Sequence, residues 1–490
     1  MTLHVEDNIR RLRGLISNNA AFVLALCFYH GWLFSFTWGF PFRSLQVSIG
    51  AFEAPLSLCS LVVGVAVMVV LCLIPKALTC SKPVLFYVAC FAMAVGIAAV
   101  AGSMLMECAL PALWCLAVAG TGVGVGVATV CWGTTITRFD PSVVAVFVAC
   151  SYLFSGIAVA LVSVLPAMAS CAILIALAVL TAVAYGRQFA SSGRPSPEQP
   201  AYCADAPAFC GDAQSSNDDS LTGAGIRFIG FACLVALLGF SGGMINALSQ
   251  NLPMDVPESY LFALAIAVAA VMLLASKMPG SDEPFSLFYR ALALIALAYM
   301  VLGTITGGTL AAFAIHSSGF MYFCGLLWVF CSMYAQRSRM PARTFAGGFV
   351  ANRLGQIAGT AVGAAIAAPI AQNAGLSTAA NAMAYVVLCA AIVLLARLSR
   401  PRSSRGDAGR ERIGMAQAVE ELARERGLTP RETEVLAFLV RGYDRTYIGS
   451  VLHVGPETVK THIRHVYDKF GIHSIAELLA CVSERADSLR

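Results

Sequence analysis

The chain has 490 residues, of which 58% are hydrophobic and only 12% are charged, and its mean hydropathy is +0.77. These values exclude a soluble globular chain and indicate a polytopic membrane protein. The 32 Lys and Arg residues only slightly outnumber the 27 Asp and Glu residues, so the placement of the charges is more informative than their sum.

Apolar runs of spanning length follow one another through residues 1–397, each near the roughly 20 residues that a transmembrane helix needs. The start of the chain is basic, but no small-residue cleavage site follows, so we expect the first run to be a retained span. The first six runs are centred near Phe28, Val65, Phe91, Val118, Leu153 and Ile175. The next six are centred near Leu234, Ala267, Leu297, Tyr322, Gly359 and Val387. This pattern predicts two six-helix membrane halves, at residues 1–186 and 226–397.

The segment between the two halves, residues 187–225, has a different composition. It is rich in Ser, Pro, Asp and Gln and cannot bury enough apolar area to order itself. We therefore predict a disordered cytoplasmic linker there.

Lys and Arg are concentrated in alternate connections between the spans, as they are in the cytoplasmic loops of membrane proteins. With the amino terminus inside, the inside set is Arg10, Arg11, Arg13, Lys76, Lys82, Arg138, Arg187, Arg194, Arg227, Lys277, Arg290, Arg337, Arg339 and Arg343. The outside set is Arg43, Glu53, Glu107, Asp255 and Glu258. We therefore expect a multi-pass protein of the inner (cytoplasmic) membrane with both termini in the cytoplasm and the lipid bilayer as a partner.

Two six-helix halves joined by a long cytoplasmic loop resemble the major facilitator fold, whose halves face a central cavity. That family usually has a Gly-x-x-x-Asp-Arg-x-Gly-Arg loop between its second and third spans. Here the corresponding segment runs from Leu73 to Lys82 and lacks the acidic residue and the arginine pair. The departure favours a receptor built on a transporter-like shell over a transporter.

Polar side chains at membrane depth are candidates for ligand binding. Arg353 lies about nine residues past the expected cytoplasmic end of its span, roughly 13 Å into the membrane, with Asn352 and Gln356 nearby. These residues point to an unknown small-molecule ligand, preferably an anion. The alternative is that Arg353 reaches back to the cytoplasmic surface or neutralises an internal partner. The weaker ligand candidates are His30, Asn246 and His316, since a lone histidine in a packed helix is more often structural.

No residue pattern predicts a metal site, a cofactor or an enzyme. The 17 cysteines are mostly scattered through the spans, and Cys203 and Cys210 of the linker lack metal-ligand spacing. His462 and His465 have no cysteine or acidic partner to complete a zinc site. The chain also offers no nucleophile–base pair, phosphate-binding loop or paired carboxylates.

Residues 398–426 are expected to form a juxtamembrane linker. Its first part is basic and suits anionic lipid headgroups, and Met415 to Arg426 has the pattern of a short amphipathic helix. No soluble segment is long enough for a phosphorylated input domain. The input signal is therefore expected through the membrane half.

Residues 427–490 have the pattern of a small water-facing domain of four helices. The first helix has Thr429 as its cap, Pro430 at its first position and Glu432 in the reciprocal capping position. A second helix, a tight link at Gly455 and a third helix complete a helix-turn-helix.

The third helix has an apolar face and a polar face. The apolar face contains Val459, Ile463, Val466 and Phe470, and the opposite face contains Lys460, Thr461, Arg464 and His465. Two cations beside a hydroxyl suit a helix that lies in a DNA major groove. The alternative is a solvated helix face, because the domain has eight basic and eight acidic residues and no net attraction for DNA.

About fifty residues here resemble the LuxR-type DNA-binding domain. The resemblance is carried by Leu428-Thr-Pro-Arg-Glu-Thr-Glu-Val-Leu436, Gly442, Ile448, Leu452, Glu457-Thr-Val-Lys-Thr-His462, Tyr467, Lys469 and Gly471. It implies that Lys460, Thr461 and Arg464 approach DNA and that Glu432 and His462 are structural. We add His465 and Lys469 to the predicted DNA contacts. The departures from the family pattern are Tyr447, Gly449, Gly455 and Phe470.

The fourth helix is expected to form a dimer contact. Ser474 and Glu477 would cap it, and its apolar residues exceed what a domain of this size needs for its own core. In LuxR-type domains the corresponding helix mediates dimerisation, which implies a homodimer on DNA formed through Leu479 and Val482. The alternative is that these residues only pack against the first helix of their own domain.

The predicted fold is therefore all-α, with about twelve transmembrane helices followed by a cytoplasmic four-helix LuxR-type domain. The function favoured is a membrane-bound one-component transcription regulator that senses a small molecule or membrane signal and binds promoter DNA. The alternatives are a major-facilitator secondary transporter with an appended regulatory domain, and a scaffold whose terminal domain binds protein.

Overall fold

The apolar runs of the sequence form long helices in a computed structural model of the chain. The structure describes residues 14–49, 52–74, 83–106, 110–191, 218–249, 257–276, 285–304, 309–336, 338, 340–372, 374–399, 417–440, 448, 452, 454–472, 477–478, 481–482 and 484–485. These residues belong to two units, Met1–Ser399 and Arg400–Arg490.

The first unit contains twelve long helices within its described residues, and each predicted centre lies inside one of them. The first six are α2 (Ala20–Trp38), α3 (Leu56–Leu73), α5 (Pro83–Leu105), α6 (Pro111–Ile136), α7 (Pro141–Val164) and α8 (Ala167–Ser191). The next six are α9 (Asp218–Ser249), α10 (Glu258–Ala275), α11 (Ser286–Thr304), α12 (Thr309–Gln336), α13 (Pro341–Gln372) and α14 (Ala374–Ser399). In the described part of the chain, nine helices are long and apolar enough to cross a membrane. The unit is a multi-pass membrane bundle, as predicted.

The helices on both sides of the middle linker are longer than predicted. α8 continues to Ser191, and α9 already begins at Asp218, so both extend into the range 187–225. An α-helix satisfies its own backbone hydrogen bonds, so a polar segment can continue an apolar helix beyond the bilayer. Residues 192–217 of the predicted linker lie outside the described residues.

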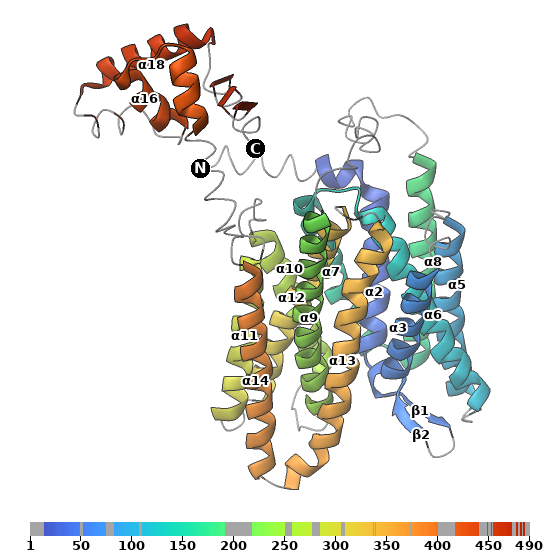
Figure 1. Cartoon of the computed structure of the whole chain (residues 1–490). Coiled ribbons are helices and arrows are strands. Elements are labelled where there is room, and N and C mark those ends of the chain that lie inside the picture. Colours follow the sequence, from blue (N-terminus) through green and yellow to red (C-terminus); the bar gives the residue numbers. More distant parts are fainter. Residues whose placement is uncertain are drawn as a thin grey trace, which may run out of the picture. The chain divides into compact units, whose positions relative to one another are not determined.

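One β-hairpin interrupts the helical pattern. After a 3-10 turn, η1 (Phe42–Ser44), strand β1 (Gln46–Ile49) pairs antiparallel with β2 (Phe52–Pro55), and Gln46 lies opposite Pro55. Val47 faces the core and is buried. Figure 1 shows this hairpin at the same end of the bundle as the connection between α13 and α14.

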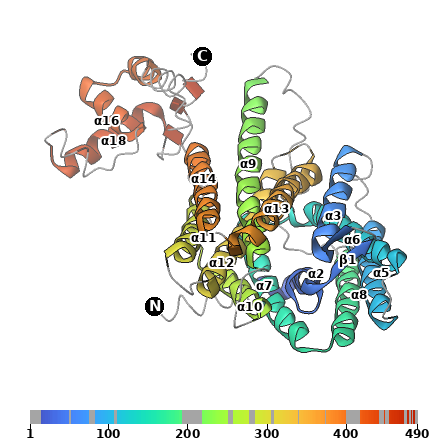
Figure 2. The ribbon, with the colours of Figure 1, turned by 90° about the horizontal axis from the view of Figure 1, so that it is seen from below.

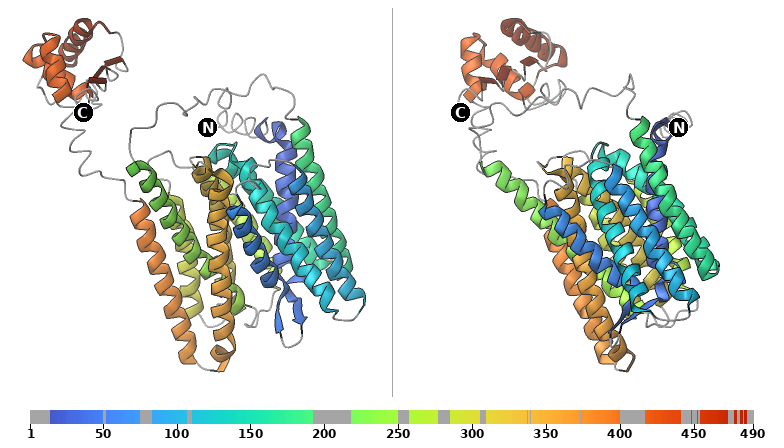
Figure 3. Two further views of the ribbon diagram at one scale, coloured as in Figure 1. Left: turned by 45° about the vertical axis from the view of Figure 1, so that its right-hand side comes forward. Right: turned by 90° about the vertical axis from the view of Figure 1, so that its right-hand side faces the viewer.

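The two halves form neighbouring groups of helices (Figure 2), and the long helices run side by side in both views of Figure 3. They meet where α7 packs against α10 and α12, and where α3 and α6 pack against α13. Large aromatic side chains fill much of the interior, among them Trp32, Trp132 and Tyr322.

The helix pair α9 and α13 is packed through glycines. A Cβ atom on Gly359 would overlap the carbonyl oxygen of Phe240, and one on Gly243 would overlap that of Gln356. The two backbones are therefore in direct contact, as small residues allow in membrane helices.

The second unit has its own apolar core. Its helices α16 (Pro430–Val440) and α18 (Pro456–Phe470) pack together, and residues 417–425 form a helix before them. The buried residues of this core are Ala418, Val419, Leu422, Val435, Leu436, Leu439, Ile448, Val459, Val466, Phe470, Ile472, Leu478 and Val482. Gly427 and Gly471 end two of the helices with φ of 64° and 69°, where glycine is favoured.

Candidate functional sites

The start of α16 has the predicted capping arrangement. The Thr429 amide donates to Glu432 Oε2 at 2.8 Å, and the Glu432 amide donates to Thr429 Oγ1 at 3.3 Å. Each side chain therefore satisfies a free amide of the first turn, which confirms the capping box.

Glu432 also connects α16 with α18. Lys469 Nζ donates to Glu432 Oε2 at 2.7 Å, and His465 Nδ1 lies 3.5 Å from Glu432 Oε1. Burial alone would raise the pKa of the Glu432 carboxyl, but the hydrogen bonds from Lys469 and Thr429 outweigh it and lower the pKa to about 2. Glu432 is thus an ionised connection between the two helices, which agrees with the structural role that the resemblance implies.

This arrangement changes the interpretation of Lys469. Its ammonium also donates to the Gly427 carbonyl at 2.8 Å, so two acceptors inside the domain hold it. Lys469 therefore has a role in attaching α18 to α16, and its contact with DNA stays a prediction.

The other polar residues of α18 lie on its open face. Lys460 and Arg464 have 61% and 82% of their side chains exposed, and Thr461 is exposed between them. Their acidic neighbours are at long distances, 3.6 Å from Lys460 Nζ to Glu457 and 3.9 Å from Arg464 Nε to Asp468. Because exposed pairs of this kind contribute little, both cations are available to a phosphate or a base.

Of the two predicted dimer residues, Leu479 and Val482, the structure describes only Val482. Val482 is 1% exposed and belongs to the domain core, so its side chain is not on a surface in this conformation. Nearby, Arg485 forms ion pairs with Glu421 and Glu425 of the helix at residues 417–425. For Val482 the burial agrees with the alternative of packing inside its own domain, and its part in a dimer contact stays a prediction. Leu479 lies outside the described residues.

A cavity of about 120 Å³ lies inside the first unit. By the same measure a water molecule needs about 10–15 Å³, so the space admits a small organic molecule. Residues of both halves line it, from α2, α3, α6 and α7 on one side and α9, α12 and α13 on the other. It contains all five predicted ligand residues: Arg353, Asn352, Gln356, His30 and Asn246.

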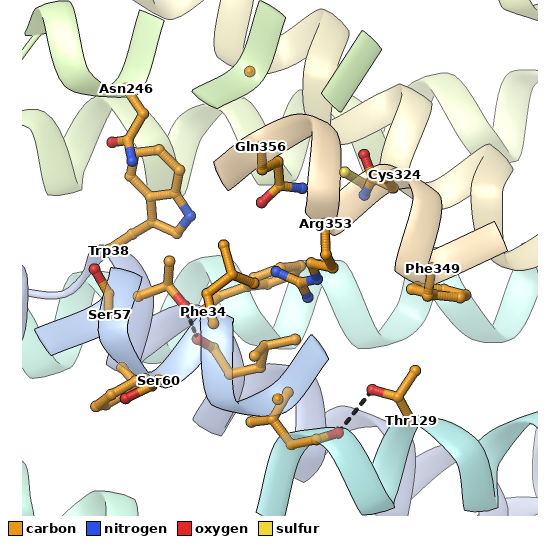
Figure 4. A pocket seen from close by; sticks show the side chains of 18 of the residues that line it. Phe34, Trp38, Ser57, Ser60, Thr129, Asn246, Cys324, Phe349, Arg353 and Gln356 are labelled. Atoms are coloured by element: carbon orange, nitrogen blue, oxygen red, sulfur yellow. Dashed lines mark hydrogen bonds between the residues drawn. The ribbon is translucent and has the colours of Figure 1, made fainter. Parts of the chain in front are cut away.

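Arg353 points into the middle of this cavity, as the close-up in Figure 4 shows. Within the part of the chain that the structure describes, its guanidinium has no hydrogen-bond acceptor and no carboxylate partner. It lies close enough to Tyr29, His30 and Tyr152 to interact with them electrostatically. The cavity therefore contains a cation whose charge is not balanced by any described neighbour.

His30 presents an acceptor to the same space. Ser151 Oγ donates to the Val148 carbonyl at 2.7 Å, and in the tautomer that fits this bond His30 Nδ1 donates to Ser151 Oγ, also at 2.7 Å. This leaves His30 Nε2 as an acceptor, which is buried and has no hydrogen-bond partner among the described residues. The Tyr152 hydroxyl and Asn352 Oδ1 are buried without a described partner as well.

His316 has a structural environment instead. Its Nε2 is 3.0 Å from Ser241 Oγ, which is 3.2 Å from the Tyr299 hydroxyl, and it does not line the cavity. This hydrogen bonding agrees with the structural interpretation of a lone histidine.

Contacts between the halves lie near the end of the cavity towards the hairpin. Arg43 forms an ion pair with Glu258, the first residue of α10, and its guanidinium lies 4.5 Å from the ring centroid of Trp38. Trp38 stacks on Phe262 of α10 at a centroid distance of 3.7 Å. At the other end, Gln336 Nε2 of α12 donates to the Thr137 and Phe139 carbonyls at 3.1 and 2.8 Å.

Sequence reasoning did not find Tyr152, Trp38 or the pair of Arg43 and Glu258 as parts of this site. One signal was present, since Arg43 is the single cation of the connections assigned to the outside. A lone cation in such a position indicates a specific partner. Because Arg43 and Glu258 are 215 positions apart, only the folded chain identifies Glu258 as that partner.

Comparisons with known proteins match these two parts separately. Residues 426–482 match the family model described as bacterial regulatory proteins, luxR family. The second unit is therefore a LuxR-type helix-turn-helix domain, which implies a role in transcription regulation.

The membrane unit is similar to solved transporter structures at low identity. A major facilitator superfamily transporter, FucP, in the outward conformation is 11% identical, with a TM-score of 0.49 over 78% of this chain and 99% of that one. The human organic anion transporter MFSD10 is 16% identical, with a TM-score of 0.49 over 78% and 97% of the two chains. A single-residue variant of the E. coli fucose:proton symporter FucP is 11% identical, with a TM-score of 0.44 over 80% and 99%.

Proposed function

We propose that this chain, which ends in a LuxR-type DNA-binding domain, is a membrane-integral one-component transcription regulator. Its membrane unit senses a small molecule, and its terminal domain binds promoter DNA. The observation that carries the proposal is a cavity between the two halves of the membrane unit, with Arg353 unpaired among the described residues, in the same chain as an exposed Lys460, Thr461 and Arg464.

The terminal domain must face the cytoplasm if it is to reach DNA. The distribution of Lys and Arg supports an inner-membrane protein with both termini inside. Reporter fusions at residues 205 and 410 should give a cytoplasmic signal, and a fusion at residue 255 an external one. An external signal at residue 205 would refute this orientation.

Promoter binding is proposed to use Lys460, Thr461 and Arg464, with His465 at the edge of the contact. A single small domain makes few phosphate contacts, so we propose that two copies bind one operator and add their contacts at high effective concentration. The resemblance to LuxR-type domains supports Leu479 as part of the proposed dimer contact. A Leu479→Asp variant that still folds and inserts in the membrane should lose promoter control, and normal regulation by it would refute pairing.

The decisive experiment maps the chromosomal DNA bound by the full-length chain in its own membrane. We expect discrete promoter sites, loss of these sites in a variant with Ala at positions 460, 461 and 464, and changed transcripts at the same promoters when the gene is deleted. The matched control is Arg424→Ala, which removes an exposed cation from the helix before α16. Equal occupancy by the triple variant and the intact chain would exclude a regulator that acts through α18.

The cavity between the two halves also supports a second candidate, a secondary transporter with an appended regulatory domain. Contacts between the halves exist at both ends of the cavity, as alternating access through a single site requires. Uptake of a cavity ligand into vesicles that contain the purified chain would favour this candidate. Binding without uptake would favour the receptor.

A further inference from the structure

We propose that the cavity binds a small organic monoanion, a carboxylate on an apolar or aromatic body. Arg353 pairs with the carboxylate, and His30 Nε2 accepts a hydrogen bond from a hydroxyl or amide group of the body. This inference rests on the proposed function, since it names the class of ligand that the membrane unit senses.

Charge is the first argument. The residues that line the cavity include no Asp or Glu, and Arg353 has no acidic partner among the described residues. An unpaired charge in a low-dielectric interior is unfavourable, whereas a guanidinium and a carboxylate form two parallel hydrogen bonds. A monoanion therefore balances the site, and a cationic ligand adds a second unpaired charge.

The position of Arg353 is the second argument. It lies twelve residues after the start of α13, roughly 18 Å along the helix axis. From that depth the side chain does not extend to the end of the helix, and it points into the cavity in Figure 4. The alternative that Arg353 reaches back to the membrane surface is not the arrangement observed.

The buried polar atoms around Arg353 are the third argument. His30 Nε2 and the Tyr152 hydroxyl are enclosed and have no hydrogen-bond partner among the described residues, whereas Asn352 Oδ1, also without a described partner, faces Gly239 of α9. Buried polar atoms are normally satisfied, so the two enclosed atoms indicate ligand groups or ordered water at this place. The acceptor at His30 selects a ligand that carries a hydrogen-bond donor in addition to its anionic group.

The apolar lining is the fourth argument and separates an organic anion from an inorganic one. Phe34, Trp38 and Phe349, labelled in Figure 4, line the cavity together with Phe320 and Trp328. A phosphate or chloride ion would leave these surfaces without a partner. A flat or branched hydrocarbon body fills the space against them.

The experiment uses the full-length chain in lipid nanodiscs. It measures the temperature of thermal unfolding and, by calorimetry, the affinity for each probe. The probes are benzoate, 4-hydroxybenzoate, cinnamate and 4-methylpentanoate, each compared with its carboxamide and its amine analogue, with sodium phosphate as the inorganic anion. We expect at least one carboxylate to raise the unfolding temperature and to bind at least about tenfold more tightly than its carboxamide. The amine analogues and phosphate should have no effect.

Three variants test the residues. Arg353→Gln should abolish the preference for the acid over the amide, and Arg353→Lys should retain part of it. His30→Phe should reduce the preference for 4-hydroxybenzoate over benzoate without removing acid selectivity. The matched control is Arg343→Gln, an exposed arginine near the start of the same helix, which should bind as the unaltered chain does.

The proposal is wrong if no carboxylate in the set binds, if acid and amide bind equally, or if Arg353→Gln keeps the acid preference. The binding measurement involves no DNA. If no acid-selective binding is found but the promoter sites remain occupied in cells, the regulator function stands and this ligand class is wrong. Conversely, the chain could bind a carboxylate selectively while the same compound leaves promoter occupancy in cells unchanged. That result would support the ligand class and refute its sensing by the membrane unit.

Discussion

The carboxylate of Glu432 serves two helices at once, because it caps α16 and accepts from Lys469 of α18. Its pKa is about 2 in the folded domain, below the ordinary carboxyl value of 4.5. A lowered pKa contributes stability that is present above pH 4.5 and is lost as the pH falls from 4.5 towards 2.

The unfolding temperature of a fragment spanning residues 417–490 should therefore fall over that pH range, and a Glu432→Gln variant should show a smaller fall. Circular dichroism at about pH 7, 4 and 2.5 checks this. Glu434→Gln is the control, because Glu434 is half exposed and, among the described residues, pairs with Arg431 on the surface. Parallel pH profiles for the Glu432 variant and the intact fragment would contradict the assigned role.

Arg464 gives the sharpest residue-scale prediction for DNA, since its side chain is 82% exposed on the open face of α18. If it contacts a base, Arg464→Ala should weaken binding to the mapped promoter by about 1–3 kcal/mol and relax sequence preference at one position. If it contacts only phosphate, binding should weaken equally on all sequences, with a smaller dependence on salt. Fluorescence anisotropy at several salt concentrations separates these outcomes, and an unchanged affinity would remove Arg464 from the interface.

Among the elements, α13 contains glycines that contact the α9 backbone directly and a glycine that has room for a side chain. The second kind is a control for substitutions of the first. A Cβ at Gly359 would overlap the Phe240 carbonyl of α9, whereas one at Gly347 would meet only the Phe228 ring at 3.5 Å, an ordinary contact. Gly359→Ala should therefore force the two helices apart and reduce the folded yield and unfolding temperature in detergent. Gly347→Ala should leave both near the starting values. If the two variants behave alike, close contact of the α9 and α13 backbones does not stabilise the bundle.

The elements differ in how far the sequence predicts them. Every predicted span centre lies in a helix, because an apolar run of membrane length has few other stable conformations. The capping box at Thr429 and Glu432 was predictable for a similar reason, since its hydrogen bonds are local. The hairpin at Gln46 to Pro55 was missed, because strands of four residues have too little periodicity to be distinguished from a loop.

The candidate cavity was predictable only in part. Arg353 and His30 are conspicuous in an apolar sequence, and the structure brings them into one space. Tyr152 is not conspicuous, because a tyrosine in an apolar run has the pattern of a core residue. The structural role of Lys469 was not predictable for a related reason, since its spacing on α18 does not reveal that its ammonium donates to the Gly427 carbonyl and to Glu432.

For the whole membrane unit, the ion pair between Arg43 and Glu258 joins the two halves at one end of the cavity. Removing one partner of a buried ion pair is unfavourable, so Glu258→Gln should open this end more often. Cys324 lines the cavity, and a membrane-impermeant maleimide should then modify it faster in a chain that retains no other cysteine.

Glu53→Gln is the matched control for this labelling, because Glu53 is an exposed carboxylate on the nearby hairpin. Its labelling rate should equal that of the unaltered background. An equal rate for Glu258→Gln would show that Arg43 and Glu258 do not control access to the cavity.

The backbone contact between α9 and α13 has a mechanical consequence for the proposed sensing of a ligand. At Gly243, Gly355 and Gly359 the nearest atoms of the facing helix are backbone atoms, so no side chain there can reorient to absorb a displacement of one helix relative to the other. Arg353 is on α13, and α9 begins at Asp218, within the range predicted for the middle linker. A ligand that displaces Arg353 would thus move α13 and α9 as one unit. The rigidity of this helix pair would determine how small a ligand can still change the conformation of the membrane unit.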